Sequence, residues 1–134
     1  MQIVTLYILT ALIFLILDGL MLTFHMQPLF RRHLGDQLLP TIRYFPAAAF
    51  YAAYIAGLLY LISLPALKSD TPILLPAMIL GAMAYGTYEF TSYAIMKAWS
   101  LEMVATDVIW GSLLTAISAW GGVALTKMIF KGTQ

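Results

Sequence analysis

The sequence predicts an all-α polytopic membrane protein, a four-transmembrane-helix bundle with a short interfacial amphipathic helix after the first span. Two features of composition indicate this fold class. Of the 134 residues, 62% are hydrophobic and 10% are charged, and the mean hydropathy is +0.89. A soluble domain has about a quarter of its residues charged. A core of this size could not bury so much apolar surface, so lipid must cover the rest.

Four apolar stretches are each long enough to cross the hydrocarbon, which takes about 20 helical residues. They lie at about 3–24, 45–64, 73–96 and 103–126, within a single domain of residues 1–134. Pro46 and Pro76 fall in first turns, where proline is tolerated. The first stretch lacks a basic segment before it and is too long for a cleaved signal, so we expect it to be retained as a span.

The link between the first two spans is predicted to hold the interfacial helix. Phe30, Leu34 and Leu38 recur at helical spacing, while Arg31 and Arg32 point elsewhere. A helix of this kind lies on the membrane surface. It would act either as a lid that contacts a head group or as a basic anchor at the interface.

Charge and cysteine content exclude several classes of protein. A net charge of +1 argues against a nucleic-acid-binding protein, which needs a basic face. The absence of cysteine excludes disulfides, thiolate metal sites and cysteine nucleophiles. Small residues four apart, such as Ala77 and Gly81, allow close helix contact in lipid and predict a compact bundle or a homodimer.

Three acidic residues, Asp18, Glu89 and Asp107, fall inside the predicted spans. Each carboxylate costs about 2.5–3.5 kcal/mol at a helix centre, and no span interior contains a Lys or Arg to offset that cost. Because successive spans alternate in direction, the three acids are expected roughly 6–10 Å below the same membrane surface, at 1.5 Å of rise per residue. They would form one layer.

Aromatic and basic side chains are predicted to complete a polar pocket around this layer. Tyr85 and Tyr93 lie four residues before and after Glu89, and therefore share its helix face. Tyrosines of the second span lie at similar depth and can hydrogen-bond a carboxylate. The predicted ligand-binding residues are Tyr51, Tyr54, Tyr85, Tyr93, Trp110, Arg31, Arg32 and Arg43.

Three interpretations of the acids stay open. In the first they are structural, pairing with tyrosines or with basic residues at the helix ends. In the second they bind a divalent cation as a cofactor, with Asp18, His25, Glu89 and Asp107 as candidate ligands. In the third they exchange protons, because clustered acids at low dielectric hold protons near neutral pH.

Several motifs resemble a bacterial four-span membrane family known as domain of unknown function 2177. They are LD at the end of the first span, LFRRHLG after it, AAFYAAYIAGLLYLISLPAL in the second span, YGTYEFTSYAIMKAW in the third and ATDVIWGSLLTA in the fourth. The family often has Asp at the position of Glu89, which keeps an acid there. The resemblance implies a four-helix protein of the inner membrane, and it implies no reaction.

We weigh three functions, and the sequence leaves open whether the protein is an enzyme. It could bind or modify a lipid or other amphipathic ligand, with Glu89, Asp107 and Asp18 in acid–base roles and the arginines on a phosphate. A second alternative is a small proton- or cation-coupled transporter that acts as a dimer and cages an organic cation between aromatic rings. The third is a membrane partner without catalysis.

The numbers of basic residues on the two sides of the membrane differ little, so they favour one orientation only slightly. Four basic residues lie on the side of the acid layer and three on the other, which slightly favours a cytoplasmic acid layer with both termini outside.

Overall fold

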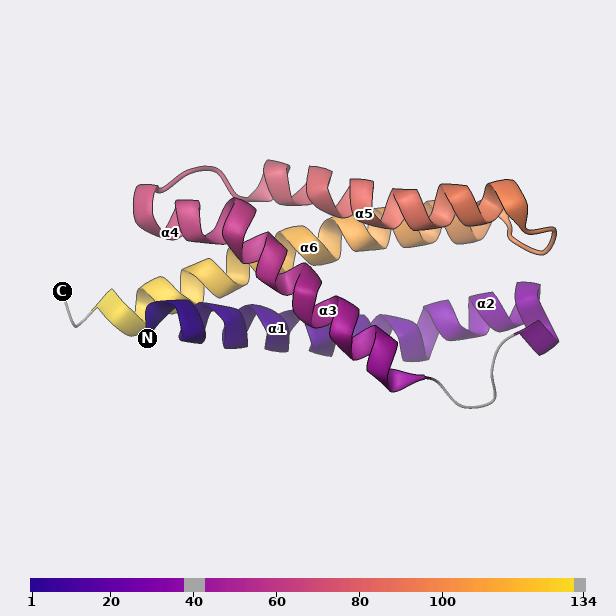
Figure 1. Ribbon diagram of the computed structural model, residues 1–134, viewed down its shortest axis with the longest axis horizontal. Helices are drawn as coiled ribbons and strands as arrows, with labels where there is room; N and C mark the ends of the chain where they lie inside the picture. Colours follow the sequence, from indigo (N-terminus) through magenta and orange to yellow (C-terminus); the bar gives the residue numbers. More distant parts are fainter. Residues whose placement is uncertain (38–42, 132–134) are drawn as a thin grey trace.

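The computed structural model describes residues 1–37 and 43–131, and every regular element in these ranges is helical. The long helices run lengthwise through an elongated bundle (Figure 1). The α-helices are α1 (Gln2–Met21), α2 (Gln27–Leu34), α3 (Tyr44–Leu58), α4 (Leu64–Ser69), α5 (Leu74–Ile95) and α6 (Leu101–Phe130), with π-helical turns η1 (Leu22–Met26) and η3 (Leu59–Ser63) and a 3₁₀ turn η2 (Gly35–Gln37).

Each π-helical turn comes directly before a proline. Turn η1 precedes Pro28 and turn η3 precedes Pro65, and each proline is the second residue of the α-helix that follows. Proline has no N–H, and its ring clashes with the carbonyl four residues earlier. A wider π turn relieves that clash without ending the helix. The chain therefore continues helically through both prolines.

This continuity corrects the prediction of a separate interfacial helix. Helix α2 extends α1, so that residues Gln2–Leu34 form one helix of 33 residues, about 50 Å long. Leu29 and Leu34 are buried against Trp99 and Met103 at the turn between α5 and α6. Packing on that turn, together with the π turn, keeps α2 in line with α1. Leu38, the third residue of the predicted apolar face, lies outside the described residues.

Within residues 1–37 and 43–131, three helical segments are long and apolar enough to cross a membrane. They are Gln2–Leu34, Tyr44–Ser69 and Leu101–Phe130, and they contain the first, second and fourth predicted spans. Helix α5 corresponds to the third predicted span and has 22 residues, but it does not meet the same standard of apolarity. The predicted count of four spans is therefore not confirmed by length and composition.

Helix α6 is the central helix of the bundle, because it packs along both α5 and α1. Contact with α5 is close enough to require glycine on both sides. A Cβ atom at Gly81 would lie 2.9 Å from Ser112 Cα, and one at Gly111 would collide with the ring of Tyr85. The expected close contact through Gly81 is thus present within a single chain.

The first half of α3 stands away from the bundle. Residues 44–50 are all exposed, with Phe45 83% and Phe50 62% exposed. Burial begins further along, where Ile55 and Leu58 enter the core. Among the described residues α3 and α5 make no extensive contact. In Figure 1 the helix crosses the bundle diagonally.

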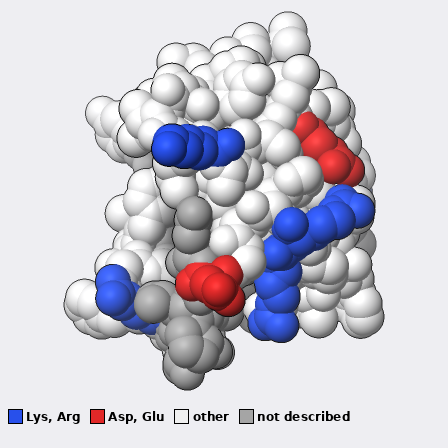
Figure 2. Space-filling view, turned by 90° about the vertical axis from the view of Figure 1, so that its right-hand side faces the viewer, with Lys and Arg blue, Asp and Glu red and all other residues white. Residues whose placement is uncertain are grey.

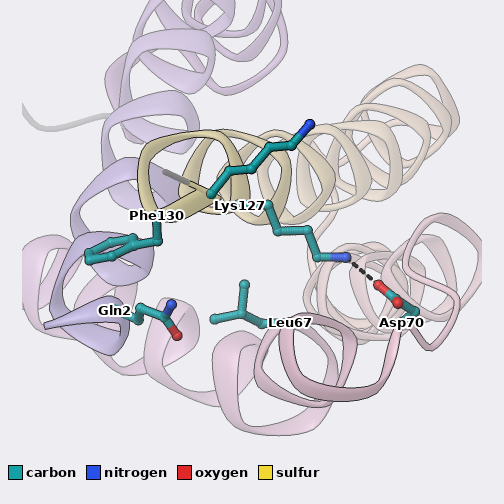
Figure 3. Close-up of a pocket in the computed structure, with 6 residues that line it drawn as sticks. Gln2, Leu67, Asp70, Lys127 and Phe130 are labelled. Atoms are coloured by element: carbon teal, nitrogen blue, oxygen red, sulfur yellow. Dashed lines mark hydrogen bonds and ion pairs between the residues drawn. The ribbon is translucent and has the colours of Figure 1, made fainter. Parts of the chain in front are cut away.

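Charged side chains mark the two ends of the bundle. Figure 2 looks onto the end formed by α2 and the α5–α6 turn, where Lys and Arg side chains gather. At the opposite end, where both termini lie, Lys127 of α6 forms an ion pair with Asp70 after α4 (Figures 1 and 3). The Lys127 ammonium lowers the pKa of the Asp70 carboxyl below its ordinary 3.8. These belts lie where water and lipid head groups would meet the bundle.

The α5–α6 contact yields a prediction on stability. Gly111→Ala adds a methyl group where the Tyr85 ring lies, so the free energy of unfolding should fall by about 1–3 kcal/mol. Gly57→Ala is the matched control, because a Cβ there meets no atom within 4 Å. It should be neutral or stabilising by up to about 1 kcal/mol. Thermal unfolding in mild detergent measures both, and equal midpoints would contradict the described helix contact.

Candidate functional site

A cavity of about 940 Å³ lies between α1, α3 and α5. Its wall includes Asp18 from α1, Asp107 from α6 and Arg43 just before α3. Most of the remaining wall is apolar or aromatic. The aromatic side chains that line it are Phe30, Phe50, Tyr51, Tyr54, Tyr85 and Tyr88. Acidic groups, rings and an exposed apolar helix therefore border one space.

Asp18 is held by donors from two other helices. Tyr51 of α3 donates a hydrogen bond to Oδ2 at 2.8 Å, and Trp110 of α6 donates to Oδ1 at 3.3 Å. The side chain is buried. Charge-assisted hydrogen bonds to a buried carboxylate are among the stronger ones in proteins. Asp18 thus links α1, α3 and α6 at the cavity wall.

Glu89 is the most buried of the three acids, with 0% of its surface exposed. Trp99 donates a hydrogen bond from Nε1 to Glu89 Oε1 at 2.9 Å. Trp99 lies in the turn between α5 and α6 and folds back against the rings of Phe30 and Tyr88. Oε2 of Glu89 is also buried, and no donor group of the described residues reaches it.

Asp107 completes the acid cluster. Its carboxyl group lies close enough to those of Glu89 and Asp18 to interact with them electrostatically. Carboxylate oxygens only accept hydrogen bonds, and like charges repel at short range. Contact between two carboxyl groups therefore requires a shared proton or a cation between them. The chain brings together all three acids that the sequence places in one layer.

The predicted aromatic residues divide into those at the cavity and those away from it. Tyr51, Tyr54 and Tyr85 line the cavity, and Trp110 reaches it through Asp18. The Tyr54 hydroxyl also hydrogen-bonds Thr115 Oγ1 at 2.8 Å. Tyr93 lies outside the lining and is exposed.

Of the three predicted arginines, Arg43 alone lines the cavity. Arg32 forms an ion pair with Glu102 at 3.5 Å, at the end of the bundle, and Arg31 is exposed beside it. The continuous helix carries both arginines past the cavity. The predicted phosphate-binding group of three arginines is therefore reduced to one at this site.

The predicted metal ligands do not form a metal-binding group. In residues 1–37 and 43–131 no set of three or more His, Cys, Asp or Glu side chains is arranged to hold a metal ion. Both oxygens of Asp18 already accept hydrogen bonds. His25 is exposed and does not line the cavity.

Trp99 is a site residue that sequence reasoning missed, as are Phe30 and Phe50 of the cavity wall. It comes after the end of α5, and only the folded turn brings its indole N–H to Glu89. The signal that could have found it is chemical. A buried carboxylate needs a hydrogen-bond donor, and an indole N–H can supply one from an apolar surrounding. Trp99 lies ten residues after Glu89, just beyond the end of the same helix.

The Asp18 hydrogen bonds yield a second prediction. Tyr51→Phe removes the shorter of the two donors, and the free energy of unfolding should fall by about 1–3 kcal/mol because a buried carboxylate loses a partner. Tyr60→Phe is the matched control on the same helical segment, since Tyr60 is 76% exposed. Chemical or thermal unfolding in detergent compares them. A Tyr51→Phe variant as stable as the control would show that the Asp18–Tyr51 bond contributes nothing.

Comparison with known proteins gives one match. A family described as predicted membrane protein, DUF2177, matches residues 3–124. Searches of curated proteins and of solved structures gave no significant match. The match covers most of the chain and most of each segment that, among the described residues, is apolar enough to cross a membrane. The chain therefore belongs to the DUF2177 family of membrane proteins, whose function is unknown.

Proposed function

We propose that this protein is a four-span membrane protein that binds an amphipathic ligand, a lipid or a molecule built like one. The polar part of the ligand would lie at the acid cluster, and its apolar part would leave between α3 and α5. The cavity carries this proposal. It has about 940 Å³, an acidic and tyrosine-rich wall, and a lining that is otherwise mostly apolar.

Four spans are supported by the course of the chain. Both termini lie at the same end of the bundle, so the chain passes along it an even number of times (Figure 1). Helix α5 has 22 residues, about 33 Å, against a hydrocarbon thickness of about 30 Å. Its most polar residue, Glu89, is buried inside the bundle and does not meet lipid. The mean hydropathy of α5 therefore underestimates how well this helix can span a membrane.

The exposed half of α3 supports a lateral route for the apolar part of the ligand. Pro46, Ala47 and Phe50 belong to that half and also line the cavity. On the opposite wall, Ala84 and Thr87 of α5 do the same. Because α3 and α5 make no extensive contact in the described chain, an acyl or alkyl chain could pass between them. Ligand pockets of this size suit a drug-sized or lipid-sized molecule.

Asp107 is the acid best placed for chemistry on the ligand. It lines the cavity, and its carboxyl neighbour Glu89 lies behind it in the protein interior. A pair of this kind can pass a proton between its members, so Asp107 would act as the acid or base with Glu89 as its partner. Asp18, whose oxygens accept two hydrogen bonds, would serve as a fixed negative charge.

Proton-coupled transport is the second candidate. The contact between the Asp107 and Glu89 carboxyl groups favours it, because such a pair exchanges protons readily. The cavity and the exposed apolar half of α3 that borders it favour ligand binding instead. An inner-membrane location with the acid layer toward the cytoplasm, and assembly as a homodimer, stay predictions.

Native mass spectrometry from a mild neutral detergent tests the proposed function. The wild-type protein should retain an amphipathic molecule from the membrane. Ala47→Trp places an indole in the cavity and should reduce the retained fraction at least tenfold. Ala53→Trp is the matched control on the same helix, because Ala53 is exposed and lies outside the cavity lining.

Two results would contradict ligand binding in this cavity. One is a bare wild-type protein, and the other is an equal retained fraction in the two tryptophan variants. A bare protein that carries protons across proteoliposomes, and loses this activity in Asp107→Asn, would favour the transport candidate.

A further inference from the structure

We propose that the ligand carries a cationic head group, an ammonium on an apolar tail, which lies against Asp107 between the aromatic rings of the cavity. This inference rests on the proposed function and specifies the chemical class of its ligand. From the sequence alone, a phosphate-bearing amphiphile belongs to the first hypothesis and an organic cation to the alternative of a transporter. The charges, the rings and the buried acid behind Asp107 each favour the cation.

The charges around the cavity are predominantly negative. Asp18 and Asp107 line it, and the buried Glu89 interacts electrostatically with Asp107, whereas Arg43 is the one basic residue among the described lining. The ion pairs of the described chain lie at the two ends, at Glu102 and at Asp70, and none of them includes the three acids. The acid cluster thus lacks a cation from the described residues. A bound ammonium would offset its charge at low dielectric.

Glu89 provides an independent observation. Its side chain is fully buried, and Oε2 has no donor partner among the described residues. A carboxylate oxygen without a hydrogen-bond donor in an apolar interior destabilises the fold, and a positive charge or a proton nearby would offset that cost. The described neighbour in its direction is Asp107, the acid that faces the cavity. An ammonium at Asp107 would compensate both carboxyl groups.

Aromatic rings from two helices surround the same space. Tyr51 and Tyr54 come from α3, and Tyr85 and Tyr88 from α5. The rings of Tyr54 and Tyr85 pack edge to face at the cavity wall, with their centroids 6.5 Å apart. A cation near such ring faces gains cation–π stabilisation, which increases when water is excluded. An anion would meet the same ring faces unfavourably.

The experiment uses three amphiphiles with the same ten-carbon tail and different heads. Decyltrimethylammonium, decyl phosphate and decyl maltoside are added separately to protein in neutral detergent, and native mass spectrometry measures the bound fraction. We expect the ammonium to bind at least tenfold more tightly than the phosphate. Asp107→Asn should remove that preference. Arg43→Gln removes the single positive charge of the lining, so it should strengthen ammonium binding.

The variants separate this inference from the proposed function on which it rests. Tighter binding of decyl phosphate, weakened by Arg43→Gln, would overturn the cationic head group and keep an amphiphile-binding cavity. Binding of all three amphiphiles that is unchanged by Ala47→Trp would overturn both. If Asp107→Asn does not fold, Asp18→Asn gives the same test, because Asp18 lines the same cavity. Undiminished ammonium preference in the folded variant would overturn the inference.

Discussion

The burial of three carboxyl groups in an apolar bundle is the constraint on which the rest of the structure depends. Each acid would destabilise a lipid-exposed helix by about 2.5–3.5 kcal/mol, so each must be enclosed and given partners by other elements. Tyr51 and Trp110 fulfil this need for Asp18, and Trp99 fulfils it for one oxygen of Glu89. The two Asp18 bonds connect α1, α3 and α6, and the Trp99 bond ties α5 to the turn that follows it. The second oxygen of Glu89 has no described donor, and the carboxyl of Asp107 interacts electrostatically with Glu89.

Packing elsewhere in the bundle serves this arrangement. Glycine contacts let α5 lie against α6 closely enough for Glu89 to meet Asp107. The π turns before Pro28 and Pro65 keep two helices continuous, although a proline would otherwise interrupt them. Helix α3 enters the core only in its second half, so its first half leaves a space beside the acids. A site that is acidic, aromatic and bordered by an exposed apolar helix follows from these local features together.

The sequence predicts the long apolar helices and the meeting of the acids well, because both depend on helical rise and on chain direction alone. Tyr51 and Tyr85, which it assigns to the same pocket as the acids, line the cavity with Asp18 and Asp107. Features that depend on a local break in a helix or on tertiary contacts cannot be predicted from the sequence in this way. The helix continues through the π turn into α2, whose Arg31 and Arg32 lie outside the cavity lining, and no periodicity rule anticipates that turn. The fold of the α5–α6 turn places Trp99, which spacing within helices cannot reveal.

A short-range cross-link between positions 89 and 107 tests most directly whether α5 and α6 bring their acids together. The chain contains no cysteine, so Glu89→Cys with Asp107→Cys offers a single possible bridge within one molecule. A short bis-thiosulfonate reagent applied to the protein in lipid nanodiscs should join the two thiols in nearly every molecule, as measured by intact mass. The control pairs Glu89→Cys with Ile109→Cys, on an exposed face of α6, and should not be joined. Equal cross-linking of both pairs, or none at positions 89 and 107, would contradict the convergence of the acids.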